Sequence, residues 1–369
     1  MAKKGSERKP KTNSKLRVAV IGCGETAERH ITALSAVPQA ELVACCDTDE
    51  RKVEDLRKRF GFKHGYTDYM KMLRPRRSRH IDVIHVCLPS VVRAGIAGYG
   101  VLTRCHVLVE PPMAYDFFTA ADMVSNIGYT GKRCSVLFPE RSNATTRYVR
   151  DLLASGRLGK IVSARSLICA PTPVKEEELN DCIYAKIAVG HLIFNVASHA
   201  IDLVNSFVGV PYVQASCSLA NRGHIGYAAA DTAEGTVTYK NGVKHSFYCT
   251  SNYDTAESTQ ISLMCENGEI VFNATDVDVR FRDGSKDGMH DDNPTGYLEE
   301  VGAFYRSCLE GGDPMADAKK ELALYEILQV LYKSALRQGV FFEKKLEESE
   351  KPDLFAPQST QKRSPLFWY

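Results

Sequence analysis

The stretch "RVAVIGCGETA", from Arg17 to Ala27, decides how the first half of this chain folds. An apolar run of strand length ends at Gly22, and residues with helical spacing follow it at once. In the pattern G-x-G-x-x-A, Gly22 permits a tight turn, Gly24 lets a ligand approach the backbone, and Ala27 lets helix and strand pack closely. The N–H groups at the start of the helix then form a site for phosphate groups.

The second strand, "ELVACCD", ends in Asp47, where a dinucleotide site places an acidic residue. A carboxylate here accepts hydrogen bonds from the adenosine ribose hydroxyls and repels a 2′-phosphate. The sequence therefore predicts a nicotinamide dinucleotide site that favours NAD, while Arg51 lies close enough in sequence to leave NADP as an alternative. The turn residues expected to bind this cofactor are Gly22, Gly24, Glu25, Thr26 and Ala27.

The order of strands and helices indicates the fold class. Further apolar strands, "DVIHVCLP", "CHVLVE" and "CSVLF", alternate with helical segments, which predicts a doubly wound parallel sheet of the Rossmann type. The second half instead has successive strand-like runs, two of them joined by the hairpin signal Asn241-Gly242, and two closing helical segments. We therefore predict an α/β Rossmann domain followed by an α+β domain with an open, mainly antiparallel sheet.

Composition and charge limit the class of protein. The chain has 369 residues and a net charge of +2, so bulk charge favours neither nucleic acid nor a membrane as partner. Twelve cysteines without a C-x-x-C spacing favour reduced thiols in the cytoplasm and no metal site. The predicted divisions are a disordered basic tail at 1–15, an NAD(P)-binding domain at 16–138, a substrate and oligomerisation domain at 139–345, and a C-terminal tail at 346–369.

Several longer motifs resemble one family. "VAVIGCGETA", "CHVLVEPPMA", "SGRLGKI", "NVASHAIDLV" and "CENGEIVF" make the chain similar to the Gfo/Idh/MocA oxidoreductases, named after glucose–fructose oxidoreductase and inositol dehydrogenase. The resemblance implies a sugar-like, polyol or other cyclic substrate between the second sheet and the nicotinamide, and a homodimer or homotetramer through that sheet. It also implies further cofactor contacts from Leu88, Pro89, Glu110 and Pro112.

The chain departs from this family where the reaction takes place. The resemblance implies a Glu-Lys-Pro lysine, an aspartate, and a histidine four residues after the aspartate, which accepts the proton of the alcohol as hydride leaves for NAD. Here Pro111 replaces the lysine and Asn195 replaces the aspartate, whereas His199 is retained. Arg93 also stands where relatives commonly have histidine. The candidate catalytic residues are His199, Asn195 and Lys186, with His191 as a further replacement group.

Three functions fit these departures. The first is an NAD(P)-dependent oxidoreductase with a modified acid–base set, which the retained His199 and the intact glycine turn favour. The second is a catalytically altered or inactive NAD-binding sensor or regulatory protein. The third is a reductase of a conjugated or imine substrate, for which a lysine aimed at a hydroxyl is unnecessary.

Overall fold

The computed structural model describes residues 15–74, 81–114, 116–170, 190, 192–222, 230–252, 258–312, 314 and 317–343. Both predicted tails, except Lys15, lie outside these residues, and so do the candidates Lys186 and His191. Within the described part of the chain, none of the helices has the length and apolar composition that a membrane span needs.

The first half forms a parallel sheet, as predicted. In the described residues this sheet has six strands in the order β3-β2-β1-β4-β5-β6, and every neighbouring pair is parallel. Its strands are β1 (Leu16–Ile21), β2 (Ala40–Cys46), β3 (His64–Tyr66), β4 (Val83–Val86), β5 (His106–Val109) and β6 (Cys134–Val136). Its helices are α1 (Glu25–Leu34), α2 (Glu50–Phe60), α3 (Tyr69–Met72), α5 (Ser90–Leu102) and α6 (Phe117–Thr130).

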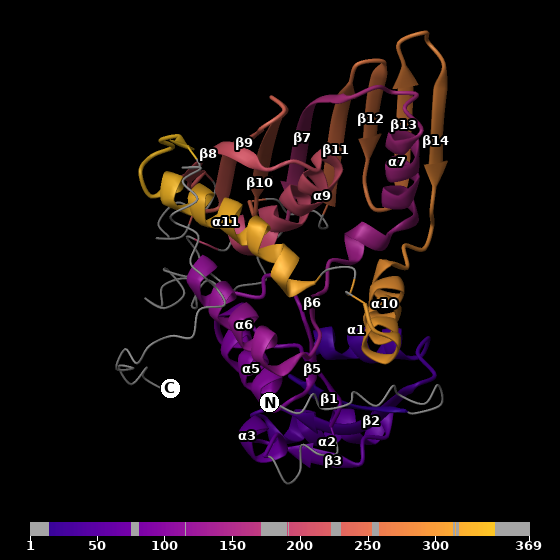
Figure 1. The fold of residues 1–369 in the computed structure, drawn as a ribbon, viewed down its shortest axis with the longest axis vertical. Coiled ribbons are helices and arrows are strands. Elements are labelled where there is room, and N and C mark those ends of the chain that lie inside the picture. Colours follow the sequence, from indigo (N-terminus) through magenta and orange to yellow (C-terminus); the bar gives the residue numbers. More distant parts are fainter. Residues whose placement is uncertain are drawn as a thin grey trace, which may run out of the picture.

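Helices cover both faces of this first sheet (Figure 1). Strand β1 shows why: Val18 packs towards α1, whereas Ala19 packs towards α5 and α6 on the opposite face. Because both faces are buried, the strands other than the edge strand β3 are largely apolar, which is the pattern that made them predictable from the sequence. All these strands run in one direction, so their carboxyl ends meet at one edge of the sheet.

The second half forms a mixed sheet that is mainly antiparallel. Among the described residues its order is β14-β13-β12-β11-β7-β10-β9-β8-β15, and β7 with β10 is the parallel pair. The strands are β7 (Ile161–Cys169), β8 (Tyr212–Ala220), β9 (Thr232–Tyr239), β10 (Lys244–Thr250), β11 (Ser258–Cys265), β12 (Gly268–Phe272), β13 (Asp276–Phe281), β14 (Lys286–His290) and β15 (Phe342–Glu343). The predicted Asn241-Gly242 hairpin joins β9 to β10, and Gly242 has a φ of +87°.

Helices pack on one face of this second sheet. They are α7 (Ala144–Ala154), α9 (Ser198–Val208) and α11 (Ala318–Ala335), with the short turns η1 (Pro139–Ser142) and η2 (Leu192–Ala197) nearby. Helix α10 (Gly296–Glu310) instead returns to the first sheet and packs beside α1, as Figure 1 shows. The predicted domain boundary at residue 138 stays a prediction. Helix α10, which comes from the second half of the chain, completes part of the core of the first sheet.

Candidate functional site

The two glycines of the first turn have different roles. Gly22 has a φ of +94°, and a Cβ atom there would lie 2.2 Å from the carbonyl oxygen of Cys87. Gly24 caps α1 with an ordinary φ of −93°, and a Cβ atom there would have no neighbour within 4 Å in the described chain. Gly22 is therefore required by the protein itself, whereas Gly24 leaves open space at the start of a helix, which fits a pyrophosphate.

Asp47 lies beside this turn with a fixed carboxylate. Its Oδ2 accepts a hydrogen bond from the backbone N–H of Cys23 at 2.8 Å, and its Oδ1 accepts one from Asp49 at 3.0 Å. The side chain of Arg51 is 94% exposed and lies 3.5 Å from Asp49. The geometry thus suits the predicted hydrogen bonds that Asp47 accepts from the ribose hydroxyls.

Glu110 follows β5 at the carboxyl edge of the first sheet. Its Oε1 atom is 2.6 Å from His30 Nε2 on α1, and it accepts a hydrogen bond from the Tyr297 hydroxyl on α10, also at 2.6 Å. The Glu110 side chain is only 13% exposed. Burial alone would raise the pKa of Glu110, but His30 and Tyr297 stabilise the carboxylate and lower the pKa.

A buried chain of hydrogen bonds continues from Glu110 into the protein. His30 Nδ1 lies 2.8 Å from His85 Nδ1, and His85 Nε2 lies 2.9 Å from the Tyr305 hydroxyl. Burial opposes a charge on His30, but Cys87 and Glu110 raise its pKa to about 10, whereas burial lowers that of His85 well below its ordinary value. We assign His30 as the imidazolium, which donates to Glu110 and to neutral His85.

Arg93 is buried and connects the ends of two strands. Its guanidinium donates to the carbonyl oxygen of Leu88 at 2.7 and 3.0 Å and to that of Pro112 at 2.6 Å. Leu88 and Pro112 are both predicted cofactor contacts, and Pro89 caps α5 beside them. Arg93 therefore fixes the backbone of the predicted site between β4 and β5.

His199 contacts a residue that the sequence analysis did not select. His199 lies at the start of α9, and its Nδ1 atom is 3.0 Å from Oε1 of Glu140 in η1. The two side chains are 27% and 35% exposed. Burial would lower the pKa of His199, but Glu140 and, more weakly, Glu110 and Asp202 raise it to about 9. The same contact lowers the pKa of Glu140 against the effect of burial.

The two oxygens of the Glu140 carboxyl group have different surroundings, since only Oε1 contacts His199. Its Oε2 atom is buried and has no hydrogen-bond partner among the described residues. A buried acceptor of this kind usually has a partner, so an unpaired one marks a position for a further donor. Glu140 also lines a cavity of about 630 Å³ next to the second sheet. The cavity's other polar side chains are uncharged amides and hydroxyls: Asn143, Thr146, Ser258, Thr259, Gln260, Asn273 and Thr275.

Asn195 and Lys186 stay predictions. Asn195 lies four residues before His199, but it belongs to the π-helical turn η2, where that spacing no longer stacks side chains as in an α-helix. The contact at His199 Nδ1 comes from Glu140 instead. Lys186 lies outside the described residues.

Glu140 could have been found from the sequence. It comes four residues after the end of β6, "CSV", so it lies at the same edge of the parallel sheet as Glu110. The rule that selected Glu110 therefore applies to Glu140 as well. His30 and Tyr297 offered no comparable signal, because their contact with Glu110 spans 80 and 187 residues of sequence.

Comparisons with known proteins show which family the chain resembles. The model of an oxidoreductase family with an NAD-binding Rossmann fold, GFO_IDH_MocA, matches residues 16–138, and the GFO/IDH/MocA C-terminal domain matches residues 146–271. The 4-carboxy-2-hydroxymuconate-6-semialdehyde dehydrogenase of Sphingobium sp. is 23% identical over 88% of this chain and 100% of its own length. D-glucoside 3-dehydrogenase of Escherichia coli is 26% identical over 63% of this chain and 69% of its own.

A solved structure shares the fold. Levoglucosan dehydrogenase, in complex with NADH and levoglucosan, matches with a TM-score of 0.80 at 18% sequence identity. The match covers 89% of this chain and 99% of that one. At this identity the match supports the two-domain fold.

Proposed function

Because this chain belongs to the Gfo/Idh/MocA oxidoreductase family, we propose that it catalyses hydride transfer between NAD and a sugar-like, polyol or other cyclic substrate, with His199 and Glu140 as its acid–base pair. NAD is its cofactor, and the first domain is an NAD-binding Rossmann domain. The observation that supports the acid–base assignment is the 3.0 Å contact between His199 and Glu140.

In this reaction the chain's own residues would have separate roles. Bound NAD supplies the hydride acceptor or donor. The N-terminus of α1 and Asp47 bind and orient the cofactor, and Glu110 stays ionised beside His30. His199, with its pKa raised to about 9, is protonated at neutral pH and can give a proton to a carbonyl oxygen of the substrate. In the opposite direction it must first lose that proton.

The cavity beside Glu140 supports a neutral, polyhydroxylated substrate. Amide and hydroxyl side chains offer both donors and acceptors, which suits hydroxyl groups. Glu140 is the charged residue among the described side chains that line the cavity, and its charge is paired with His199, so this lining offers no cation to bind a carboxylate or phosphate. Several relatives are named for sugar or polyol substrates, including the D-glucoside 3-dehydrogenase and a myo-inositol 2-dehydrogenase.

The assignment can be tested on purified protein. Binding is measured by the fluorescence of NADH, and neutral sugars, polyols and their oxidised forms are then screened in both directions. We expect binding together with turnover of a neutral cyclic substrate.

The replacement of the family's lysine by Pro111 favours a second candidate, a sensor that binds NADH without turnover. Binding of a partner protein that depends on NADH, with no turnover, would decide for that candidate.

Replacing Asp47 with alanine is expected to reduce the preference for NADH over NADPH. The substitution removes the carboxylate that repels the 2′-phosphate of NADPH. It also removes the hydrogen bonds with the adenosine ribose of NADH. Fluorescence titration with both cofactors measures the ratio of dissociation constants. Asp47→Asn is the matched control for shape, because its amide oxygen can still accept from Cys23. An unchanged ratio in both variants would show that Asp47 does not contact the ribose.

We propose that the protein forms a symmetric oligomer through the face of the second sheet opposite α7, α9 and α11. Met264 on this face is 48% exposed. Met264→Asp should convert the oligomer into monomers in light scattering. Phe118→Asp, on α6 and 70% exposed, should leave the mass unchanged. A wild-type monomer at micromolar concentration would contradict the proposal.

The free thiols of the described cysteines support a reducing compartment, the cytoplasm.

A further inference from the structure

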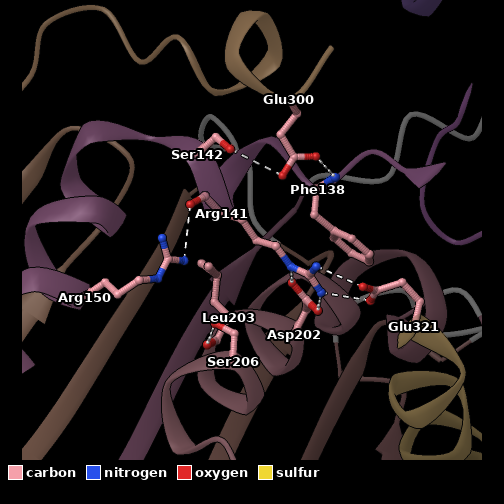
Figure 2. A network of polar contacts seen from close by, with 9 residues as sticks. All are labelled: Phe138, Arg141, Ser142, Arg150, Asp202, Leu203, Ser206, Glu300 and Glu321. Atoms are coloured by element: carbon pink, nitrogen blue, oxygen red, sulfur yellow. Dashed lines mark hydrogen bonds and ion pairs between the residues drawn. The ribbon is translucent and has the colours of Figure 1, made fainter. Parts of the chain in front are cut away.

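Arg141 lies next to Glu140 in sequence and binds two carboxylates at once. Its Nε donates to Asp202 Oδ2 at 2.6 Å, and its Nη2 donates to Asp202 Oδ1. Its Nη1 and Nη2 also donate to the two oxygens of Glu321 at 2.9 and 2.8 Å. Figure 2 shows the guanidinium between these carboxylates, which come from α9 and α11. One side chain therefore joins η1 to two helices of the second half.

This network is buried in the described part of the chain. The side chains of Arg141, Asp202 and Glu321 are 13%, 1% and 4% exposed. A third carboxyl, Glu300, accepts a hydrogen bond from the backbone of Phe138 at 2.9 Å, and its burial raises its pKa well above the ordinary value. Burial also raises the pKa of Glu321 to about 7, whereas Arg141 opposes that shift. Arg141 is thus the cation that holds this acidic cluster together.

Residues of the network lie near both members of the acid–base pair, Glu140 and His199, in the sequence. On η1, Arg141 follows Glu140 directly, and on α9, Asp202 lies three residues after His199. The ring of Phe138 lies close to both Arg141 and His199. Its centroid is 5.0 Å from the guanidinium carbon of Arg141 and 5.6 Å from the centroid of the His199 ring. A movement of η1 relative to α9 would therefore separate Glu140 from His199.

We propose that Arg141 is a positioning residue, which holds Glu140 against His199 by clamping η1 to α9 and α11. The proposal rests on the proposed function, because that function gives the His199–Glu140 pair its role in acid–base chemistry. It does not require Arg141 to touch the substrate. The planar guanidinium suits this task, since it forms two parallel hydrogen bonds with each carboxylate, which an ammonium group cannot do.

Loss of charge and loss of position have opposite effects on His199. The charged groups that face His199 are Glu140, Glu110 and Asp202, and all three favour the imidazolium. If Arg141 acted only through its charge, its removal would leave Asp202 less compensated and raise the pKa of His199. If it positions Glu140, its removal separates the pair, and burial then lowers the pKa of His199. The sign of the change therefore separates the two roles.

The test is titration of His199 by NMR in protein with labelled histidine, with the signal assigned by its absence from His199→Gln. In Arg141→Met the pKa of His199 is expected to fall from about 9 towards the ordinary value of about 6.5. Arg141→Lys keeps the charge but cannot bridge both carboxylates, so a smaller fall is expected. Arg147→Met is the control, because Arg147 donates to Ser142 on the same segment and should leave the pKa unchanged.

Arg141→Lys decides the question if Arg141→Met does not fold, as judged by circular dichroism. A pKa of His199 that is unchanged in Arg141→Lys, or raised in a folded Arg141→Met, would overturn the positioning role. The variant Glu140→Gln distinguishes a failure of the positioning role of Arg141 from a failure of the proposed acid–base pair. If Glu140→Gln lowers the pKa of His199 and Arg141→Lys does not, only the positioning role is wrong. If Glu140→Gln also has no effect, the acid–base pair itself is wrong.

Discussion

Replacing Gly24 with valine is expected to abolish NADH binding while the chain stays folded. The backbone at Gly24 has a φ of −93°, which any residue can adopt, and a Cβ atom there would have no neighbour within 4 Å in the described chain. The added side chain would instead occupy the space through which the pyrophosphate reaches the N-terminus of α1. We expect at least about a 100-fold weaker affinity, which corresponds to a loss of about 2.8 kcal/mol.

Fluorescence titration measures this affinity, and circular dichroism with thermal unfolding checks the fold. Gly22→Val is the matched comparison, because it should destabilise the protein itself. Its φ of +94° strains a branched side chain, and its Cβ atom would lie 2.2 Å from the carbonyl oxygen of Cys87. A folded Gly24→Val protein with wild-type affinity for NADH would contradict the placement of the pyrophosphate at this turn.

Most strands of the first sheet were predictable because burial on both faces makes them largely apolar, whereas the edge strand β3, "HGY", is exposed and was missed. "RVAVIG" and "ELVACCD" correspond to β1 and β2 nearly residue for residue. Strand β13, "DVDVRF", lies between β14 and β12 and alternates apolar and polar residues, so a pattern typical of a half-buried strand was present there and was overlooked. Strand β14, "KDGMH", was missed because it lies at the edge of the second sheet and exposes most of its side chains. Edge strands need no apolar run, so the sequence pattern that identifies a buried strand is absent from them.

The cofactor half of the site was predictable for a different reason. Its turn is a local feature, and a few adjacent residues specify it. The Glu110–His30–Tyr297 cluster depends on the return of α10 to the first sheet, which no local pattern indicates. The same holds for Glu140 and His199, whose contact spans 59 residues. Side-chain contacts between distant segments follow from the three-dimensional packing, and one sequence does not specify that packing by inspection.

The loss of the family's lysine also has a different meaning in the folded protein. Pro111 cannot bear a charge, but the neighbouring Glu110 is paired with the His30 imidazolium from α1. A cation therefore still lies near the carboxyl end of β5, although it is buried and held by a carboxylate. It cannot act on a substrate as a free lysine would. In the proposed reaction the proton must therefore come from a more exposed group, and we expect this to be the His199–Glu140 pair, whose side chains are 27% and 35% exposed.

Replacing His199 with alanine is accordingly expected to reduce turnover of the protein's substrate by about 10²- to 10⁴-fold, the usual cost of removing a positioned acid or base. NADH affinity should change by no more than a few-fold, because the expected cofactor contacts come from the turn after β1 and from Asp47. Steady-state kinetics and NADH titration measure the two effects separately. Glu140→Gln should give a smaller loss, since the histidine remains but its charged partner is removed.

The dependence of kcat/KM on pH tests the same assignment with a definite sign. His199 has its pKa raised to about 9, so it is protonated across the neutral range. In the direction of reduction it acts as the acid, and kcat/KM should be constant below about pH 9 and fall above it. In the direction of oxidation it acts as the base, and kcat/KM should rise with pH up to about 9. Glu140→Gln should move both inflections to lower pH, and His199→Ala should remove them. If a substrate is found whose turnover and pH profile survive His199→Ala, proton transfer lies elsewhere, and Lys186 and His191 are the next residues to replace.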